Sequence, residues 1–179
     1  MRALITMARI IDQANERLGR IAVWLVLIAC VVSAGNAVSR YALDLSSNAW
    51  LELQWYLFTA MVLLGAPFVL SANGHVRVDI LYGRAEPRTR AWIDLLGLVF
   101  FLLPMAALIA FLAWPFFVES FLGGETSSNA GGLLRWPVKL LLPVGFGLLF
   151  LQGVAEIIKR IAYLRGMLDL DSHYEKPLQ

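Results

Sequence analysis

A small group of polar residues lies where two long apolar runs of the sequence approach each other along the chain. Asn36 and Arg40 end the first run, one helical turn apart, and Glu52 and Gln54 open the second. About a dozen residues separate Arg40 from Glu52, so the two can pair across a helical hairpin. Either such a pair fixes the hairpin, or the polar layer contacts another subunit or helps an ion to move. A scaffold role is favoured, because a coupling site is expected near the bilayer midplane.

Four further charged residues lie near the ends of apolar runs. Asp94 and Glu156 stand close to basic residues and are expected to be hydrated or paired with a nearby Arg or Lys. Lys139 either extends toward the membrane surface or pairs with Glu119. The middle of every run holds almost no polar group, so the sequence predicts that the chain alone has no path for a polar solute.

The residue sets that metal, haem and nucleotide chemistry require are missing from the sequence. His75 and His173 are the two histidines, and both lie outside the apolar runs, where they cannot be axial ligands of a membrane haem. Cys30 is the single cysteine and is interpreted as a packing residue inside an apolar run. No glycine-rich phosphate loop occurs. We therefore expect no enzymatic activity, no cofactor and no metal ion in this chain.

The elements that must position these residues are membrane-spanning helices. Only 16% of the 179 residues are charged and 59% are hydrophobic, whereas a soluble domain carries about a quarter charged residues. A helix needs about 20 mostly apolar residues to cross the bilayer core. Four runs satisfy this length without alternating polarity, which predicts an all-α integral membrane protein with four transmembrane helices. The spans cover about 21–39, 49–70, 91–117 and 137–158, and Pro104 and Pro115 are expected to bend the third.

The basic residues predict the orientation of these helices. Of 15 Lys and Arg residues, all but Arg40, Arg135 and Lys139 lie in the N-terminal segment, the loop between spans two and three, or the C-terminal tail. This bias predicts that both termini face the cytoplasm, and that the loops around Asp44 and Gly124 face outward. The even overall charge, +2, does not fit a nucleic-acid partner.

The N-terminal segment has a helical pattern of its own. Residues 1–18 place apolar side chains on one face, which suggests an amphipathic helix in the membrane interface. A plain cytoplasmic extension of the first span explains the pattern equally well. Residues 1–165 are expected to form one membrane domain and residues 166–179 a polar cytoplasmic tail. The apolar face consists of Leu4, Met7, Ala8, Ile11, Ala14 and Leu18, and Gly65, Gly145 and Gly147 are expected to permit close helix approach.

Several short motifs, in their order along the four spans, resemble one known family. The first span ends in the run from Asn36 through Arg40 to Tyr41, and the second opens with Trp50-Leu51-Glu52-Leu53-Gln54. The segment from Gly74 to Ile80, which contains His75, Arg77 and Asp79, follows the second span. The chain resembles the small membrane subunit of tripartite ATP-independent periplasmic (TRAP) transporters. The stretch 125–137 is similar to the branch labelled mannitol/chloroaromatic type, whose members are also linked with 2-oxo acids and lactate.

This resemblance implies a non-catalytic subunit in a bacterial inner membrane. It would support a large membrane subunit that carries the transport path and the sodium sites, and it would help to dock a periplasmic substrate-binding protein. Membrane lipids are its other expected partners. Within the resemblance, Asn36, Arg40, Tyr41, Glu52 and Gln54 match an outer-face motif that is structural or contacts a subunit. His75, Arg77 and Asp79 match a cytoplasmic motif, and Glu119, Glu125, Asn129 and Arg135 are candidate contacts for the binding protein.

One alternative function fits the same span count. A self-assembling four-helix exporter of small molecules or cations would also have four short spans. Such an exporter needs a carboxylate well inside a helix, and Glu52, the loose candidate, sits near a helix end.

Overall fold

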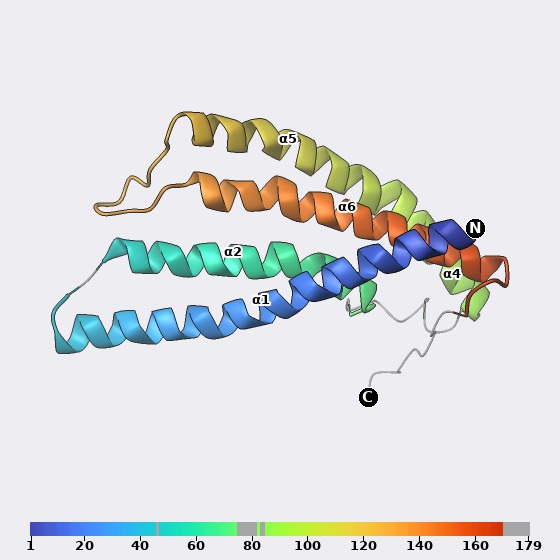
Figure 1. Cartoon of the computed structure of the whole chain (residues 1–179), viewed down its shortest axis with the longest axis horizontal. Coiled ribbons are helices and arrows are strands. Elements are labelled where there is room, and N and C mark those ends of the chain that lie inside the picture. Colours follow the sequence, from blue (N-terminus) through green and yellow to red (C-terminus); the bar gives the residue numbers. More distant parts are fainter. Residues whose placement is uncertain (46, 75–81, 83–84, 170–179) are drawn as a thin grey trace.

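The computed structural model describes residues 1–45, 47–74, 82 and 85–169, and this part of the chain is helical without strands (Figure 1). The predicted cytoplasmic motif of His75, Arg77 and Asp79 lies outside the described residues. Four helical stretches are long and apolar enough to cross a membrane, which confirms the predicted fold class. The elements are α1 (Arg2–Ala42), α2 (Asn48–Ser71), α4 (Pro87–Gly97), η1 (Leu98–Leu102), α5 (Leu103–Leu122) and α6 (Trp136–Leu164).

The last helix, α6, holds the bundle together. It packs against α1, α2, α4 and α5, while α1 also packs along α2. In Figure 1 the start of α1, the helix α4 and the end of α6 lie at one end of the bundle. The connections that follow α1 and α5 lie at the opposite end. The N-terminus and the end of α6 are therefore on the same side of the bundle.

The N-terminal segment continues into the first span without a break. Residues 2–42 form one helix, which at about 1.5 Å per residue is about 60 Å long. Its first half is not free: Ala8, fully buried, packs with Ala155 and Ile158 of α6, and Ile11 lies against the same cluster. The segment is thus continuous with the span, and part of the predicted apolar face is used for packing on α6. The position of this segment in the membrane interface stays a prediction.

The third span contains a local distortion at Pro104. A five-residue π-helical turn, η1, separates α4 from α5 and ends two residues before this proline. Proline has no N–H, so the carbonyl of Phe100 loses its usual helical donor, and a wide turn accommodates the mismatch. Pro115 lies inside α5 without such a turn.

Two glycines of α6 allow its neighbours to come close. A Cβ atom at Gly145 would lie 2.7 Å from the Cβ of Leu63 in α2, and one at Gly153 would lie 2.6 Å from a methyl carbon of Leu102. The expectation for Gly145 is confirmed, since only a hydrogen fits between the helices there. Gly147 has no described neighbour from another helix within 4 Å of its Cβ position, so a close approach of another protein at Gly147 stays a prediction.

Candidate functional site

The connection between α5 and α6 folds into an ordered loop, residues 125–135, which we call the 125–135 loop. Its two ends meet where the Arg135 N–H donates to the Glu125 carbonyl at 2.8 Å, and the Ser127 N–H donates to the Leu133 carbonyl at 3.0 Å. Gly131 at the turn has a φ of +70°, a left-handed conformation that favours glycine. Hydrogen bonds of the loop's own backbone therefore define its shape, in addition to any side-chain contact.

Glu52 of α2 holds the 125–135 loop through its carboxylate. Asn129 donates from its amide nitrogen to Oε1 at 2.8 Å, and the Leu133 N–H donates to Oε2 at 2.7 Å. The Ser127 hydroxyl donates to Oε1 as well. Glu52 is only 5% exposed, and these three donors satisfy both of its oxygens. A carboxylate so close to the apolar part of a helix is stabilised by such donors.

Two neighbours of Glu52 on α2 extend this contact. Asn48 donates from its amide to the Ala130 carbonyl at 3.1 Å, and the Tyr56 hydroxyl donates to the Leu134 carbonyl at 3.0 Å. The three residues are four apart in the sequence, so they share one face of the helix. Sequence analysis missed Asn48 and Tyr56, although their spacing from Glu52 was the available signal.

Of the two alternatives for Arg40 and Glu52, the internal pair does not form in the described structure. Arg40 is exposed and forms no ion pair with any acidic side chain that the structure describes. The reason is geometric: the carboxylate of Glu52 faces the 125–135 loop, which supplies three hydrogen-bond donors to it. No described hydrogen bond joins Asn36, Tyr41 or Gln54 to Glu52 either, and Tyr41 is 89% exposed. A contact of these residues with another subunit stays a prediction.

A second cluster ties the 125–135 loop to the start of α6. Lys139 forms an ion pair with Glu125, and Arg135 lies 3.8 Å from the same carboxylate. The hydrogen bond from Lys139 holds the pKa of the Glu125 carboxyl below its ordinary value. The Nζ atom of Lys139 also lies 3.8 Å from the centre of the Phe116 ring. The expected partner, Glu119, is exposed on α5, so the pairing of Lys139 with Glu119 is corrected to Glu125.

At the opposite end, a buried amide joins α1 to α6. Gln152, fully buried, accepts from the Asn15 amide at 2.7 Å and donates to Asp12 at 2.7 Å. Lys159 donates to Asp12 at 3.0 Å, which adds a charged contact between the same helices. The sequence pattern did not indicate a role for Asp12 and Asn15, because their hydrogen-bond partners lie about 140 residues later in the chain.

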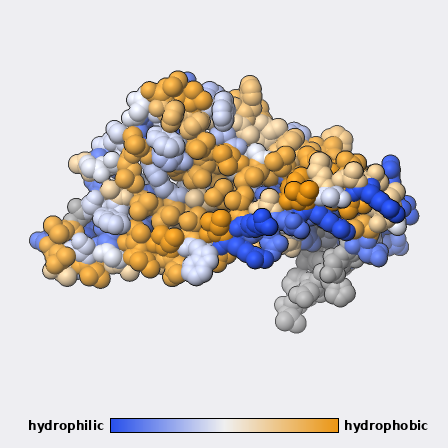
Figure 2. All heavy atoms as spheres, in the orientation of Figure 1, coloured by the Kyte–Doolittle hydropathy of each residue, from blue (hydrophilic) through white to orange (hydrophobic). Residues whose placement is uncertain are grey.

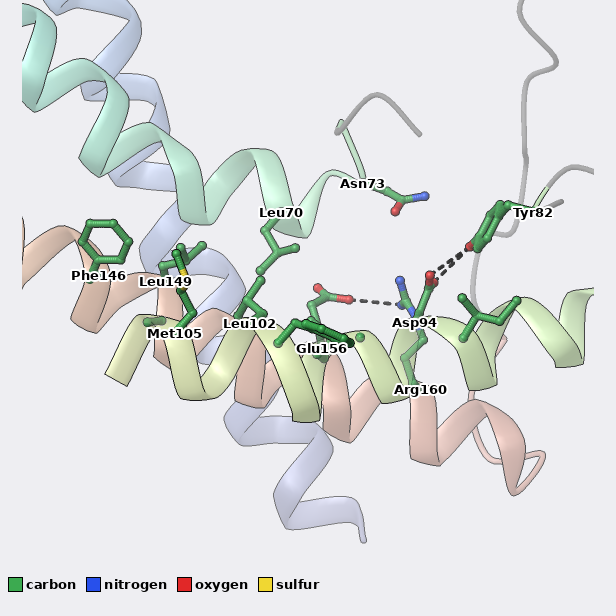
Figure 3. A pocket seen from close by; sticks show the side chains of 15 residues that line it. Leu70, Asn73, Tyr82, Asp94, Leu102, Met105, Phe146, Leu149, Glu156 and Arg160 are labelled. Atoms are coloured by element: carbon green, nitrogen blue, oxygen red, sulfur yellow. Dashed lines mark hydrogen bonds and ion pairs between the residues drawn. The ribbon is translucent and has the colours of Figure 1, made fainter. Parts of the chain in front are cut away.

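The acidic residues Asp94 and Glu156 are both paired, as expected. Arg160 donates to Asp94 at 3.2 Å and to Glu156 at 3.1 Å, and the Tyr82 hydroxyl donates to Asp94 at 3.1 Å. These groups close one end of a groove of about 790 Å³ that is lined by α2, α4, η1, α5 and α6 (Figure 3). The rest of the groove is lined mainly by apolar side chains such as Leu102 and Phe146, and it opens at the surface.

Comparison with known proteins assigns the chain to a family. The family model described as "Tripartite ATP-independent periplasmic transporters, DctQ component" matches residues 28–162. The C4-dicarboxylate TRAP transporter small permease protein DctQ of Pseudomonas aeruginosa is 29% identical to the chain over 136 residues. That match covers 73% of this chain and 61% of the relative, so the chain spans about three fifths of the relative's length. No solved structure matches.

The family match includes the polar groups at the loop end and part of those at the opposite end. Residues 28–162 contain Glu52, the whole 125–135 loop and the Gln152–Glu156 region of α6, but not Asp12 or Asn15. The match begins after the first half of α1. This first half packs on α6 but lies outside the matched residues. The chain belongs to the DctQ component family of TRAP transporters, which are transporter subunits and not enzymes.

Proposed function

We propose that this chain supports the large membrane subunit of a TRAP transporter and presents the 125–135 loop to a periplasmic substrate-binding protein. Both termini face the cytoplasm of a bacterial inner membrane in this proposal. Uptake runs on a sodium gradient, and the sodium sites and the solute path belong to the large subunit. The chain itself holds no cofactor.

One observation carries this proposal: the 125–135 loop is fixed to α2 by the carboxylate of Glu52. A loop bound by three side-chain contacts and its own backbone bonds presents a constant surface, and preorganised surfaces bind partners at lower entropic cost. Arg135, Asn129 and Glu125, whose side chains are at least partly exposed, are the polar groups that the loop presents. Glu119 lies nearby at the end of α5 and is the fourth candidate contact.

The placement of charge supports a scaffold rather than a solute path. Every Asp, Glu, Lys and Arg on the described helices lies toward one end of the bundle or the other. Glu52, which an exporter of the alternative kind would use, is engaged with the 125–135 loop. A cation bound at this carboxylate would compete with the three hydrogen bonds that it accepts from the loop.

The solute in this proposal is an organic acid. The P. aeruginosa relative is named for C4-dicarboxylates, and the resemblance to the mannitol/chloroaromatic branch adds 2-oxo acids and lactate. Succinate and lactate are therefore the first probes. The choice between them belongs to the binding protein, which meets the solute first.

A reconstitution experiment tests the proposal. The chain is placed in liposomes alone, and in parallel with the large subunit and binding protein encoded beside it, with an inward sodium gradient. We expect radiolabelled succinate or lactate to accumulate only in the complete system, and only while the gradient lasts. Accumulation by the chain alone, or uptake by the other two proteins at an unchanged rate without it, would contradict the scaffold role.

A matched pair of variants tests the loop. Glu52→Gln removes the acceptor charge beneath the 125–135 loop, whereas Asp44→Asn removes an exposed charge at the same end of the bundle. Glu52→Gln is expected to co-purify with the large subunit but to require more binding protein for half-maximal uptake. Asp44→Asn is expected to have the smaller effect. Equal behaviour of the two variants would remove the role of Glu52 in docking.

A further inference from the structure

The first half of α1 presents an exposed surface that no contact in the bundle explains. Its packing face uses Ala8, Asn15 and Gly19, which are buried. Beside that face runs a strip of apolar side chains that are 42% to 61% exposed, and beside the strip lies a row of arginines. The apolar strip consists of Leu4, Met7, Ile10 and Ile21, and the arginine row of Arg2, Arg9, Arg17 and Arg20.

Contacts with α6 fix the level of this segment relative to the spans. Asp12 touches both Gln152 and Lys159, and Ala8 packs with Ile158. The apolar part of α6 ends at Ile158, where Lys159 and Arg160 follow. In Figure 1 this part of α1 crosses α6 obliquely. The first half of α1 therefore lies along the level where the apolar part of the bundle ends, instead of projecting straight away from it.

Two arginines of this row form no ion pair within the described part of the chain. Arg20 is paired with Glu16 at 2.6 Å. Arg9 and Arg17 are exposed and form no ion pair with any described acidic side chain. Figure 2 shows a hydrophilic line along this stretch of α1, bordered by hydrophobic atoms. An apolar strip flanked by basic side chains is the arrangement by which helices bind anionic membrane surfaces.

We propose that the first half of α1 binds anionic phospholipids. The apolar strip enters the boundary between headgroups and acyl chains, and Arg2, Arg9 and Arg17 contact the lipid phosphates. Two observations favour lipid over a soluble protein as the occupant. The strip continues through Ile21 directly into the span, and its level coincides with the end of the apolar part of α6. The binding does not depend on which solute the transporter carries.

Fluorescence in lipid nanodiscs tests this proposal on the full chain. A polarity-sensitive dye is attached at Met7→Cys in a Cys30→Ala background, and phosphatidylglycerol is increased in a phosphatidylcholine bilayer. We expect the dye to report an apolar environment that becomes more apolar as phosphatidylglycerol increases, and this response should weaken in high salt. Arg9→Gln with Arg17→Gln should weaken the response by about fivefold for each arginine removed.

A charge-matched double variant provides the control. Arg88→Gln with Arg165→Gln removes two exposed arginines from other elements at the same end of the bundle, one in α4 and one directly after α6, and it should respond as the parent does. The proposal is overturned if both double variants respond equally, or if the parent ignores phosphatidylglycerol. It is also overturned if the dye stays in water until the large subunit is added, because the strip would then be a protein interface.

Discussion

Glu52 illustrates how a single carboxylate can organise one end of a membrane bundle. Its oxygens face donors from a loop that is 75 to 81 residues away in the sequence, and this satisfies a charge close to apolar surroundings. The exposed Arg40, by contrast, has no described acidic partner. The position of Glu52 is therefore explained by the loop that it holds.

Replacement of Glu52 tests this explanation directly. Glu52→Gln presents an amide to donors that need an acceptor, so the 125–135 loop should open more often. We expect amide hydrogen exchange across residues 125–135 to accelerate about tenfold, which corresponds to the loss of roughly one hydrogen bond. Exchange in α6 beyond the loop should stay unchanged, and Glu119→Gln should leave the whole pattern as it is. Unchanged exchange in Glu52→Gln would contradict the anchoring role.

Glu125 adds a pH dependence to the same loop. The Lys139 hydrogen bond lowers the pKa of Glu125 in the folded protein below its ordinary value of 4.5. A lowered folded-state pKa means that the ionised carboxylate stabilises the fold above pH 4.5, and that this contribution is lost as the pH falls through the folded-state pKa. The parent should therefore unfold at a higher temperature than Glu125→Gln at neutral pH. The two melting curves should converge under acid, and a constant difference would contradict the assignment.

At the level of elements, sequence length and hydropathy predicted the four helices because each must satisfy its own backbone in lipid. The contacts between elements were not predictable in the same way. Lys139 pairs with Glu125 instead of Glu119, and Glu52 binds the 125–135 loop instead of Arg40. Both contacts form because backbone bonds and the left-handed turn at Gly131 place that loop over α2. Such a loop conformation depends on distant partners, which hydropathy does not report.

Alanine substitutions at two glycines of α6 test how closely this helix packs against its neighbours. Gly145→Ala would place a methyl group 2.7 Å from the Cβ of Leu63 and 3.0 Å from its carbonyl oxygen. Relief of this overlap requires α2 to move, so we expect a loss of about 1–3 kcal/mol in the free energy of unfolding. Gly147→Ala meets open space and should be neutral or stabilising by up to about 1 kcal/mol. Denaturant titration in detergent measures both, and equal effects would argue against close packing at Gly145.

At the level of the whole molecule, the charged groups divide between two ends. One end holds the 125–135 loop with Glu52, and the other holds the network of Asp12, Glu156 and Arg160 that joins α1 to α6. The apolar helices between them expose large side chains around the bundle. This pattern suits a protein that is surrounded by lipid and by a larger membrane partner, with polar contacts reserved for the two surfaces.

The orientation of these two ends is the remaining prediction. Nine of the 12 Lys and Arg residues that the structure describes lie at the end that carries the N-terminus, so that end should stay in the cytoplasm. In a Cys30→Ala background, single cysteines at Asp44 and Ala130 should react with a membrane-impermeant maleimide on spheroplasts. Cysteines at Glu86 and Met167, which are equally exposed at the other end, should react only after the membrane is opened. The reverse pattern would place the 125–135 loop in the cytoplasm, out of reach of any periplasmic protein, and would refute the docking role together with the orientation.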